Sequence, residues 1–216
     1  MVFTSLEFLF LFFPIVLIGY FFINPKAGFE NLWLLFASLV FYYIGAKEQI
    51  WLLVSIILIA YVSGLTFTLL ESKIVAVVYK RIVLAISIAA MLFTMAYFKY
   101  FNFVIFNINV FFNKSLAAKE IALPIGISFF TFQAISYVVD VYRGEKALVN
   151  PIDMGLYISF FPQLIAGPIV RFKDVSEYLD KKYREVNFDK ISDGIWRFSI
   201  GFCKKVLLAN NLGGGS

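Results

Sequence analysis

The chain consists of long apolar segments separated by short polar loops. A bilayer has about 30 Å of hydrocarbon, and roughly 20 helical residues are needed to cross it. The segment 49–70 contains no charged residue and is the clearest spanning helix. The pattern predicts an all-α, polytopic integral membrane protein with about five spanning helices plus re-entrant and interfacial helices. The apolar segments lie near 5–23, 31–45, 49–70, 82–112, 121–141, 151–170 and 195–209.

The segment lengths refine this prediction. Segments 31–45 and 195–209 are short, and such helices tilt, insert partway or lie along the interface. Segment 82–112 is longer than a bilayer needs. We expect it to span to about Phe98 and to continue as an interfacial helix, with Lys99 extending toward the headgroups.

Segment 151–170 is interrupted by Pro162, Gly167 and Pro168. A broken helix is tolerated at membrane depth only where protein or a water-filled cavity surrounds it. We therefore predict a re-entrant element here. The charges of the loops favour the same topology, because a re-entrant 151–170 places twelve Lys and Arg residues on one side and three on the other. By the positive-inside rule, this arrangement predicts an N-terminus outside the membrane.

Composition supports a membrane protein and excludes several chemistries. The chain of 216 residues is 61% hydrophobic and 15% charged, whereas soluble domains are about 45–50% apolar and 25% charged. It has no histidine and one cysteine, Cys203, which excludes Ser-His-Asp catalysis, His-ligated zinc and a disulfide within the chain. We expect no metal site and a buried Cys203. The net charge is +5. The basic residues lie between apolar runs, so we interpret them as a topology signal rather than as a nucleic-acid surface.

The C-terminal part holds nine of the 19 basic residues. Residues 173–186 have apolar positions at helical spacing and predict an interfacial amphipathic helix. A second helix is expected to start at the N-cap Asn187, with an apolar stripe on one side. Basic residues on its other side are candidates for binding a phosphorylated donor molecule or, alternatively, lipid headgroups. These are Lys190, Arg197, Lys204 and Lys205.

Polar residues inside the apolar segments are candidates for the lining of a cavity. Gln133, Tyr137 and Asp140 share one helical face, and Arg143 follows one turn later. We interpret them as a polar seam near the cytoplasmic mouth of a tunnel; the alternative is an Asp140–Arg143 pair that only anchors the helix at the interface. Gln163 and Arg171 flank the broken segment and have the same two interpretations.

Three blocks of sequence resemble the membrane-bound O-acyltransferases. The blocks are 123–144 (LPIGISFFTFQAISYVVDVYRG), 159–171 (SFFPQLIAGPIVR) and 201–212 (GFCKKVLLANNL). The opening residues 1–14 and the run 31–43 add to the likeness. The resemblance is strongest to the bacterial branch that contains the alginate O-acetyltransferase membrane subunit and peptidoglycan O-acetyltransferases. It runs through residues 1–212, which we expect to be the N-terminal part of such a membrane domain; 213–216 (GGGS) resembles a linker.

The resemblance implies a function that this chain does not complete. Members of the family take an acyl group from a cytoplasmic thioester, such as acetyl-CoA or an acyl carrier protein, and pass it through a tunnel to an extracytoplasmic acceptor. An essential histidine in the later part of the family performs this chemistry, and none occurs here. The sequence therefore predicts no catalytic residue, no bound cofactor and no activity of this portion alone. It also implies a bacterial cytoplasmic membrane, a polysaccharide acceptor and an extracytoplasmic acyltransferase partner.

Two other classes remain open at this stage. A small transporter or channel would also explain a broken helix beside intramembrane polar residues. A noncatalytic scaffold that recruits a secreted acyltransferase through its outer loops is the third possibility. The order and spacing of the three blocks favour the acyltransferase, because transport requires no such motifs.

Overall fold

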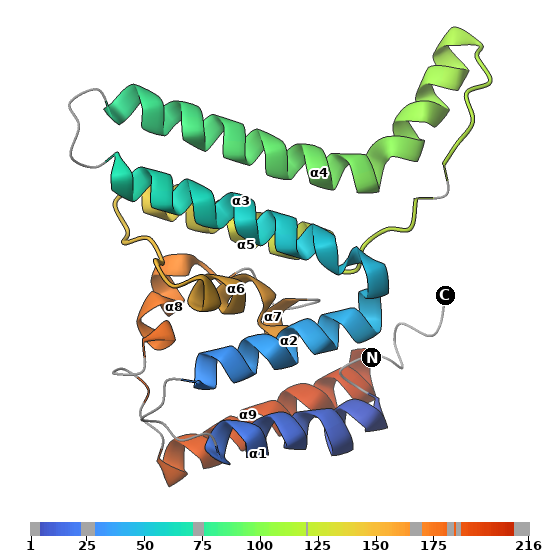
Figure 1. Ribbon diagram of the computed structural model, residues 1–216. Coiled ribbons are helices and arrows are strands. Elements are labelled where there is room, and N and C mark those ends of the chain that lie inside the picture. Colours follow the sequence, from blue (N-terminus) through green and yellow to red (C-terminus); the bar gives the residue numbers. More distant parts are fainter. Residues whose placement is uncertain are drawn as a thin grey trace.

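The computed structural model describes residues 5–22, 29–70, 76–119, 121–164, 170–180, 184 and 187–209. Within these ranges every regular element is a helix, which confirms the predicted all-α class. Figure 1 shows the helices in layers, with α4 at one edge, α3 and α5 next, the short α6, α7 and α8 in the middle, then α2, and finally α1 and α9. Their bounds are η1 Phe8–Phe12, α1 Phe13–Phe22, α2 Glu30–Ala46, η3 Lys47–Gln49, α3 Ile50–Leu69, α4 Ala76–Phe112, α5 Ile127–Tyr142, α6 Pro151–Ser159, α7 Phe161–Leu164, α8 Phe172–Leu179, α9 Phe188–Cys203 and η5 Lys204–Ala209.

Two stretches are long and apolar enough to cross a membrane, Glu30–Leu69 and Val77–Phe112. The first is divided at Lys47, which has a φ of 47°. There the chain turns back, so that α2 and α3 run in opposite directions (Figure 1). The segment predicted as 31–45 is therefore a helix of 17 residues aligned with its neighbours, and the segment predicted as 49–70 matches α3 closely.

Helix α4 is a continuous helix of 37 residues, about 55 Å at 1.5 Å per residue. This is well beyond the thickness of a bilayer, as the sequence predicted. The C-terminal part of α4 bends away from the bundle in Figure 1. Two asparagines on this part hold the following loop, since Asn102 bonds both backbone groups of Lys119 (2.8 and 3.1 Å) and Asn109 bonds both backbone groups of Leu116 (2.9 and 2.8 Å).

The main core lies where α3 and α5 pack together, flanked by α4, α6 and α8. Helices in lipid gain little from burying apolar surface against one another, and close approach at small residues drives their packing instead. Gly64 of α3 is such a residue, because a Cβ there would clash with the Tyr137 hydroxyl and press on its ring. A second cluster joins η1 and α1 to α2 and α7 through Phe8, Phe41 and Phe161.

Helix α5 begins later than the sequence suggested. The apolar segment starts near residue 121, but α5 starts at Ile127. Gly126 adopts a left-handed conformation with a φ of 75°, and Ile127 donates its N–H to the Pro124 carbonyl at 3.3 Å. The Pro-Ile-Gly sequence thus forms a turn in front of the helix.

The helix predicted over 173–186 is too long. Helix α8 ends at Leu179, and Asp180 is extended. Several positions used for the prediction, including Tyr183 and Val186, lie outside the described residues. The helix ends because Asn31 and Arg184 bond the carbonyls of its last turn, as described below.

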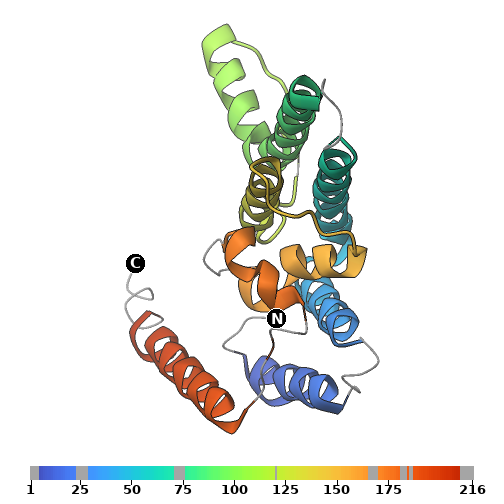
Figure 2. The same cartoon turned by 90° about the vertical axis from the view of Figure 1, so that its left-hand side faces the viewer.

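Helix α9 begins where predicted, since the Asn187 side chain accepts a hydrogen bond from the Lys190 N–H at 2.8 Å. Its apolar stripe is largely exposed, with Phe198 stacked on Phe13 of α1 at 5.2 Å. Figure 2 shows α9 standing apart from the rest of the bundle. Cys203, expected to be buried, is exposed at its end, because no described helix covers that face of α9.

Candidate functional site

The break between α6 and α7 is stabilised by side chains from two other helices, α5 and α2. Phe160, with a ψ of 112°, separates α6 from α7, and Pro162 has no N–H to donate back to α6. Tyr157 would normally bond its carbonyl to the Phe161 N–H four residues later. Instead the carbonyl accepts from Gln133 Nε2 at 2.6 Å, and the Phe161 N–H donates to Ser38 Oγ at 3.2 Å. The prediction of a broken helix inside the protein is confirmed for the described residues; Gly167 and Pro168 lie outside them.

The predicted polar seam brings together some of its members. Gln133 Nε2 of α5 lies 3.5 Å from Gln163 Oε1 of α7. Tyr137 is also buried, but its hydroxyl accepts from the Leu148 N–H at 3.1 Å. Gln133 and Tyr137 thus stabilise backbone that would otherwise lack partners, while Gln163 is only half-buried.

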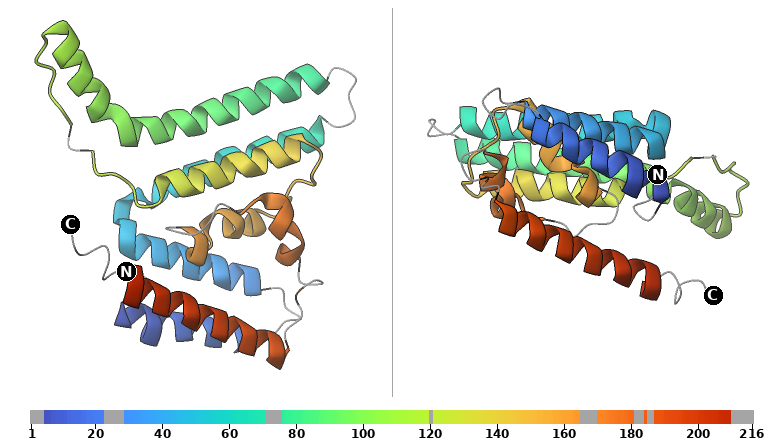
Figure 3. Two further views of the ribbon diagram at one scale, coloured as in Figure 1. Left: turned by 180° about the vertical axis from the view of Figure 1, so that it is seen from behind. Right: turned by 90° about the horizontal axis from the view of Figure 1, so that it is seen from below.

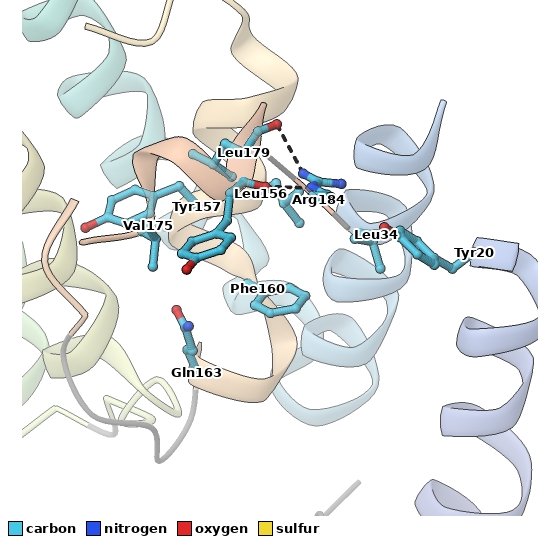
Figure 4. Close-up of a pocket in the computed structure, with 10 residues that line it drawn as sticks. Tyr20, Leu34, Leu156, Tyr157, Phe160, Gln163, Val175, Leu179 and Arg184 are labelled. Atoms are coloured by element: carbon cyan, nitrogen blue, oxygen red, sulfur yellow. Dashed lines mark hydrogen bonds between the residues drawn. The ribbon is translucent and has the colours of Figure 1, made fainter. Parts of the chain in front are cut away.

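A mostly apolar cavity of about 230 Å³ lies beside this break. We call it the tyrosine pocket. Figure 4 shows that Gln163 and Arg184 approach it from opposite sides, with Leu34 and Tyr20 contributed by α2 and α1. Four separate parts of the chain therefore enclose a single cavity. Its lining comprises Tyr20, Leu34, Leu156, Tyr157, Phe160, Gln163, Val175, Tyr178, Leu179 and Arg184.

One wall of the tyrosine pocket is fixed by a network around Arg184. Its guanidinium donates to the carbonyls of Tyr178 (2.5 Å) and Leu179 (3.1 Å) and to Asn31 Oδ1 at 2.6 Å. The Asn31 amide in turn donates to Asp153 Oδ1 at 2.6 Å and to the Leu179 carbonyl at 3.1 Å. This network joins α2, α6 and the C-terminus of α8, where a cation also complements the helix dipole.

A second cavity, which we call the arginine pocket, lies at the end of α5. It has a volume of about 530 Å³. Three of the predicted tunnel residues meet here, namely Asp140, Arg143 and Arg171. No ion pair joins Asp140 to Arg143 within the described residues, so the simple anchor pair considered above is not formed. The lining comprises Phe132, Ile135, Ser136, Val139, Asp140, Arg143, Glu145, Arg171 and Lys173.

The cations proposed to bind a donor lie elsewhere. Lys190, Arg197, Lys204 and Lys205 are exposed along α9 and η5, and Arg197 pairs with Asp193 at 3.0 Å. Because α9 runs along the length of the bundle (Figure 3), about 20 Å separates the first of these cations from the last. They therefore do not converge on one ligand, and neither pocket described above includes them.

Several residues at these sites gave no signal in the sequence. Asn31 is 122 positions from its partner Asp153 and 153 positions from its partner Arg184. Ser38 is 123 positions from its partner Phe161. A single sequence contains no local pattern for such contacts. No group of three potential metal-ligating side chains occurs among the described residues.

Comparison with known proteins gives a consistent result. The model of the membrane-bound O-acyltransferase family matches residues 50–213. The chain is 37% identical to a probable alginate O-acetylase AlgI of Azotobacter vinelandii and 38% identical to one of Pseudomonas aeruginosa, covering 98% of this chain and 42% and 40% of those proteins. It is 33% identical to a peptidoglycan O-acetyltransferase of Helicobacter pylori, covering 98% of this chain and 45% of that protein.

No solved structure matches this chain. The chain spans less than half the length of the curated relatives it matches. The match to the family model nevertheless covers most of the chain, including α3 to α9 with their interrupted segment and the whole lining of the arginine pocket. The chain belongs to the membrane-bound O-acyltransferase family.

Proposed function

We propose that this chain forms part of an O-acetyltransferase that modifies an extracytoplasmic polysaccharide. The donor would be a cytoplasmic acyl thioester, and the acceptor a sugar hydroxyl. The names of the relatives support acetyl transfer to alginate or peptidoglycan. Passing an acyl group from one side of a membrane to the other requires a protein-lined path, and a membrane protein builds such a path from interrupted helices.

The observation that carries the proposal is the interrupted α6–α7 segment, which lines the tyrosine pocket. Tyr157 of this segment lines that pocket and donates its hydroxyl to the Val170 carbonyl at 3.0 Å, next to Arg171 of the arginine pocket. The first cavity is mainly apolar and suits an acyl group, and the second is charged and suits a polar carrier. This arrangement supports acyl transfer better than a scaffold role, which needs neither cavity.

In this proposal the residues described here hold and orient the substrates, but they supply no general base for the reaction. Removing a proton from a sugar hydroxyl needs a group that titrates near neutrality, and the chain has no histidine. In this proposal the base lies outside these 216 residues. Gln163 would orient the thioester carbonyl from the wall of the tyrosine pocket, and residues 1–216 alone would transfer no acyl group.

We also propose an orientation in a bacterial cytoplasmic membrane, with the N-terminus outside. The described loops alternate between two ends of the bundle (Figure 1): η3 and 113–119 lie at one end, and 143–150 and α8 at the other. This alternation supports the loop assignment made from the positive-inside rule. In a Cys203→Ala background, the thiol introduced by Lys114→Cys should react with a membrane-impermeant maleimide added outside the cell. The thiol introduced by Arg81→Cys should react only after lysis. The reverse pattern would overturn the orientation.

The function is tested in proteoliposomes that contain the complete protein. Radiolabelled acetyl-CoA, or an acetylated carrier protein, is supplied on the cytoplasmic side and alginate or a peptidoglycan fragment on the other. We expect label in ester linkage to the acceptor, and at least about tenfold less with Gln163→Leu, the loss of one orienting hydrogen bond in a water-poor site. The matched control is Gln49→Leu, which removes a glutamine whose side-chain amide donates to the Ala122 carbonyl of a loop. Absence of transfer from either donor, or movement of free acetate without an acceptor, would refute the proposal.

A further inference from the structure

A groove lies on the outer face of the bundle between α3 and α4, two neighbouring helices that run in opposite directions (Figure 1). We call it the α3–α4 groove. Its volume is about 490 Å³, and its lining extends from Leu58 to Thr66 on α3 and from Val83 to Ala90 on α4. Both helices belong to the two stretches that are apolar enough to cross a membrane. The groove therefore opens toward the hydrocarbon of the bilayer.

Small residues form the floor of the α3–α4 groove, and large residues form its rims. Ser63 and Ser87 on the floor are buried. Their hydroxyls donate to carbonyls of their own helices, four residues back. The rims are exposed and apolar, and consist of Leu58, Val62 and Ile86. Because the buried hydroxyl protons are already bonded, the groove suits a hydrocarbon ligand.

The dimensions of the α3–α4 groove favour a single carbon chain over another helix. The lined segments of α3 and α4 are about 12 and 10 Å long, close to the hydrocarbon depth of one leaflet, which is about 15 Å. A transmembrane helix is about 10–12 Å wide, and close contact with it requires small residues on the surface. Here the small residues lie below the rims, so that a second helix would rest on the rims and leave the floor empty.

One end of the α3–α4 groove is positively charged. Lys80 lies three residues before Val83 and seven before Ser87, which places it on the same face of α4. It forms no ion pair or hydrogen bond within the described part of the chain, and its neighbours Tyr79 and Arg81 are exposed. Helix α3 contains no charged residue, and the first turn of α4 contains no acidic one. Basic and aromatic side chains at the end of an apolar span are typical of the headgroup level.

We propose that the α3–α4 groove holds one acyl chain of an anionic phospholipid. Lys80 and Arg81 contact the phosphate, while Tyr79 lies at the level of the headgroup. The charge of the headgroup follows from Lys80, whose positive charge no described acidic side chain offsets. An anionic lipid supplies the missing charge, whereas the headgroup of phosphatidylcholine brings a cation of its own. This site is independent of acyl transfer and of the two pockets beside the broken segment.

The test is equilibrium binding of lipid to the complete protein in detergent, followed by native mass spectrometry. The probes are dioleoylphosphatidylglycerol, which is anionic, and dioleoylphosphatidylcholine, which has the same chains and no net charge. We expect the wild-type protein to bind one molecule of the anionic lipid at least about fivefold more tightly than the neutral lipid. Lys80→Gln should weaken binding of the anionic lipid about fivefold and leave the neutral lipid unchanged. The matched control, Lys114→Gln, removes an exposed lysine beyond the other end of α4 and should change neither.

A second pair of variants tests the groove itself. Ala90→Leu places a larger side chain in the lining and should weaken binding of both lipids about fivefold or more, because the acyl chain loses its place. The matched control is Ala89→Leu, an exposed position next to it that does not line the groove, and binding there should stay as in the wild type. Since both variants add the same side chain to α4, a difference between them reports the groove.

Three results would overturn the proposal. The first is equal affinity of the wild-type protein for the two lipids, and the second is unchanged binding of the anionic lipid by Lys80→Gln. The third is a dimer of the complete protein that Ala90→Leu dissociates and Ala89→Leu does not, because the groove would then accommodate a second copy of the chain. Selective binding that is lost in Lys80→Gln and in Ala90→Leu, and kept in both controls, would establish the site.

Discussion

The hydrogen bond between Ser38 and the Phe161 N–H offers a quantitative test of how the broken segment is held. Ser38 is fully buried, and its hydroxyl donates to the Leu34 carbonyl at 2.7 Å while accepting from the Phe161 N–H at 3.2 Å. The substitution Ser38→Ala removes both bonds. Losing the first has little effect, because the carbonyl keeps its helical partner, but losing the second leaves a buried N–H without an acceptor.

A matched control isolates that second bond. Ser63 of α3 is 5% exposed and donates to the Ile59 carbonyl at 2.7 Å, the same i−4 bond within a helix. No backbone N–H of another helix donates to it among the described residues. The pair Ser38→Ala and Ser63→Ala therefore differs chiefly in the stranded Phe161 N–H.

The expected difference follows from the desolvation of that N–H. A buried donor left without an acceptor costs about 1–3 kcal/mol, and for 150–250 residues each kcal/mol shifts the thermal midpoint by about 2–4 °C. Ser38→Ala should thus lower the midpoint by about 2–12 °C more than Ser63→Ala. The measurement is tryptophan fluorescence during heating of the detergent-solubilised protein. Equal midpoints for the two variants would mean that the break at Phe160 does not depend on Ser38.

Three further outcomes are expected. Gly64→Ala should lower the free energy of unfolding obtained from thermal denaturation, since its Cβ would clash with the Tyr137 hydroxyl and ring. Gly45→Ala, whose Cβ meets nothing closer than 4.0 Å, should leave that free energy unchanged or raise it by up to about 1 kcal/mol; the opposite ranking would contradict the packing of α3 on α5. Arg184→Leu should speed amide hydrogen exchange in the last turn of α8 by about tenfold or more, as a charged hydrogen bond to its carbonyls is lost; unchanged exchange would show that the network is not needed there. Cys203 should react with a maleimide in the folded protein as fast as after denaturation, and a protected thiol would show that α9 is covered in solution.

Local signals in the sequence predict the ends of several helices. Asn187 caps α9 through a hydrogen bond to the Lys190 N–H, and Asn150 with Pro151 starts α6 in the same way. Both depend on residues within three positions, which a single sequence displays. The start of α5 was placed too early because hydrophobicity alone does not register the turn at Gly126, whose φ is 75°.

The pairing of distant segments could not be predicted in the same way. The end of α8 depends on Arg184 and on Asn31, which come from separate parts of the chain. Amphipathic periodicity continues past Leu179, so the pattern alone favoured a longer helix. Likewise, Arg171 was a candidate beside the broken segment, but its position near Asp140 and Arg143 follows from how α8 packs against α5.

The structure also changes how the polar residues of the core should be interpreted. A buried glutamine in a membrane helix raises the choice between a structural and a functional role, and Gln133 has its amide committed to the Tyr157 carbonyl. Replacing it therefore disturbs the backbone of the broken segment and any substrate path together. Gln163, which faces the tyrosine pocket in Figure 4 and is half-buried, has no such commitment to the backbone among the described residues. Loss of activity at Gln163 with unchanged stability is consequently stronger evidence for a substrate path than loss of activity at Gln133.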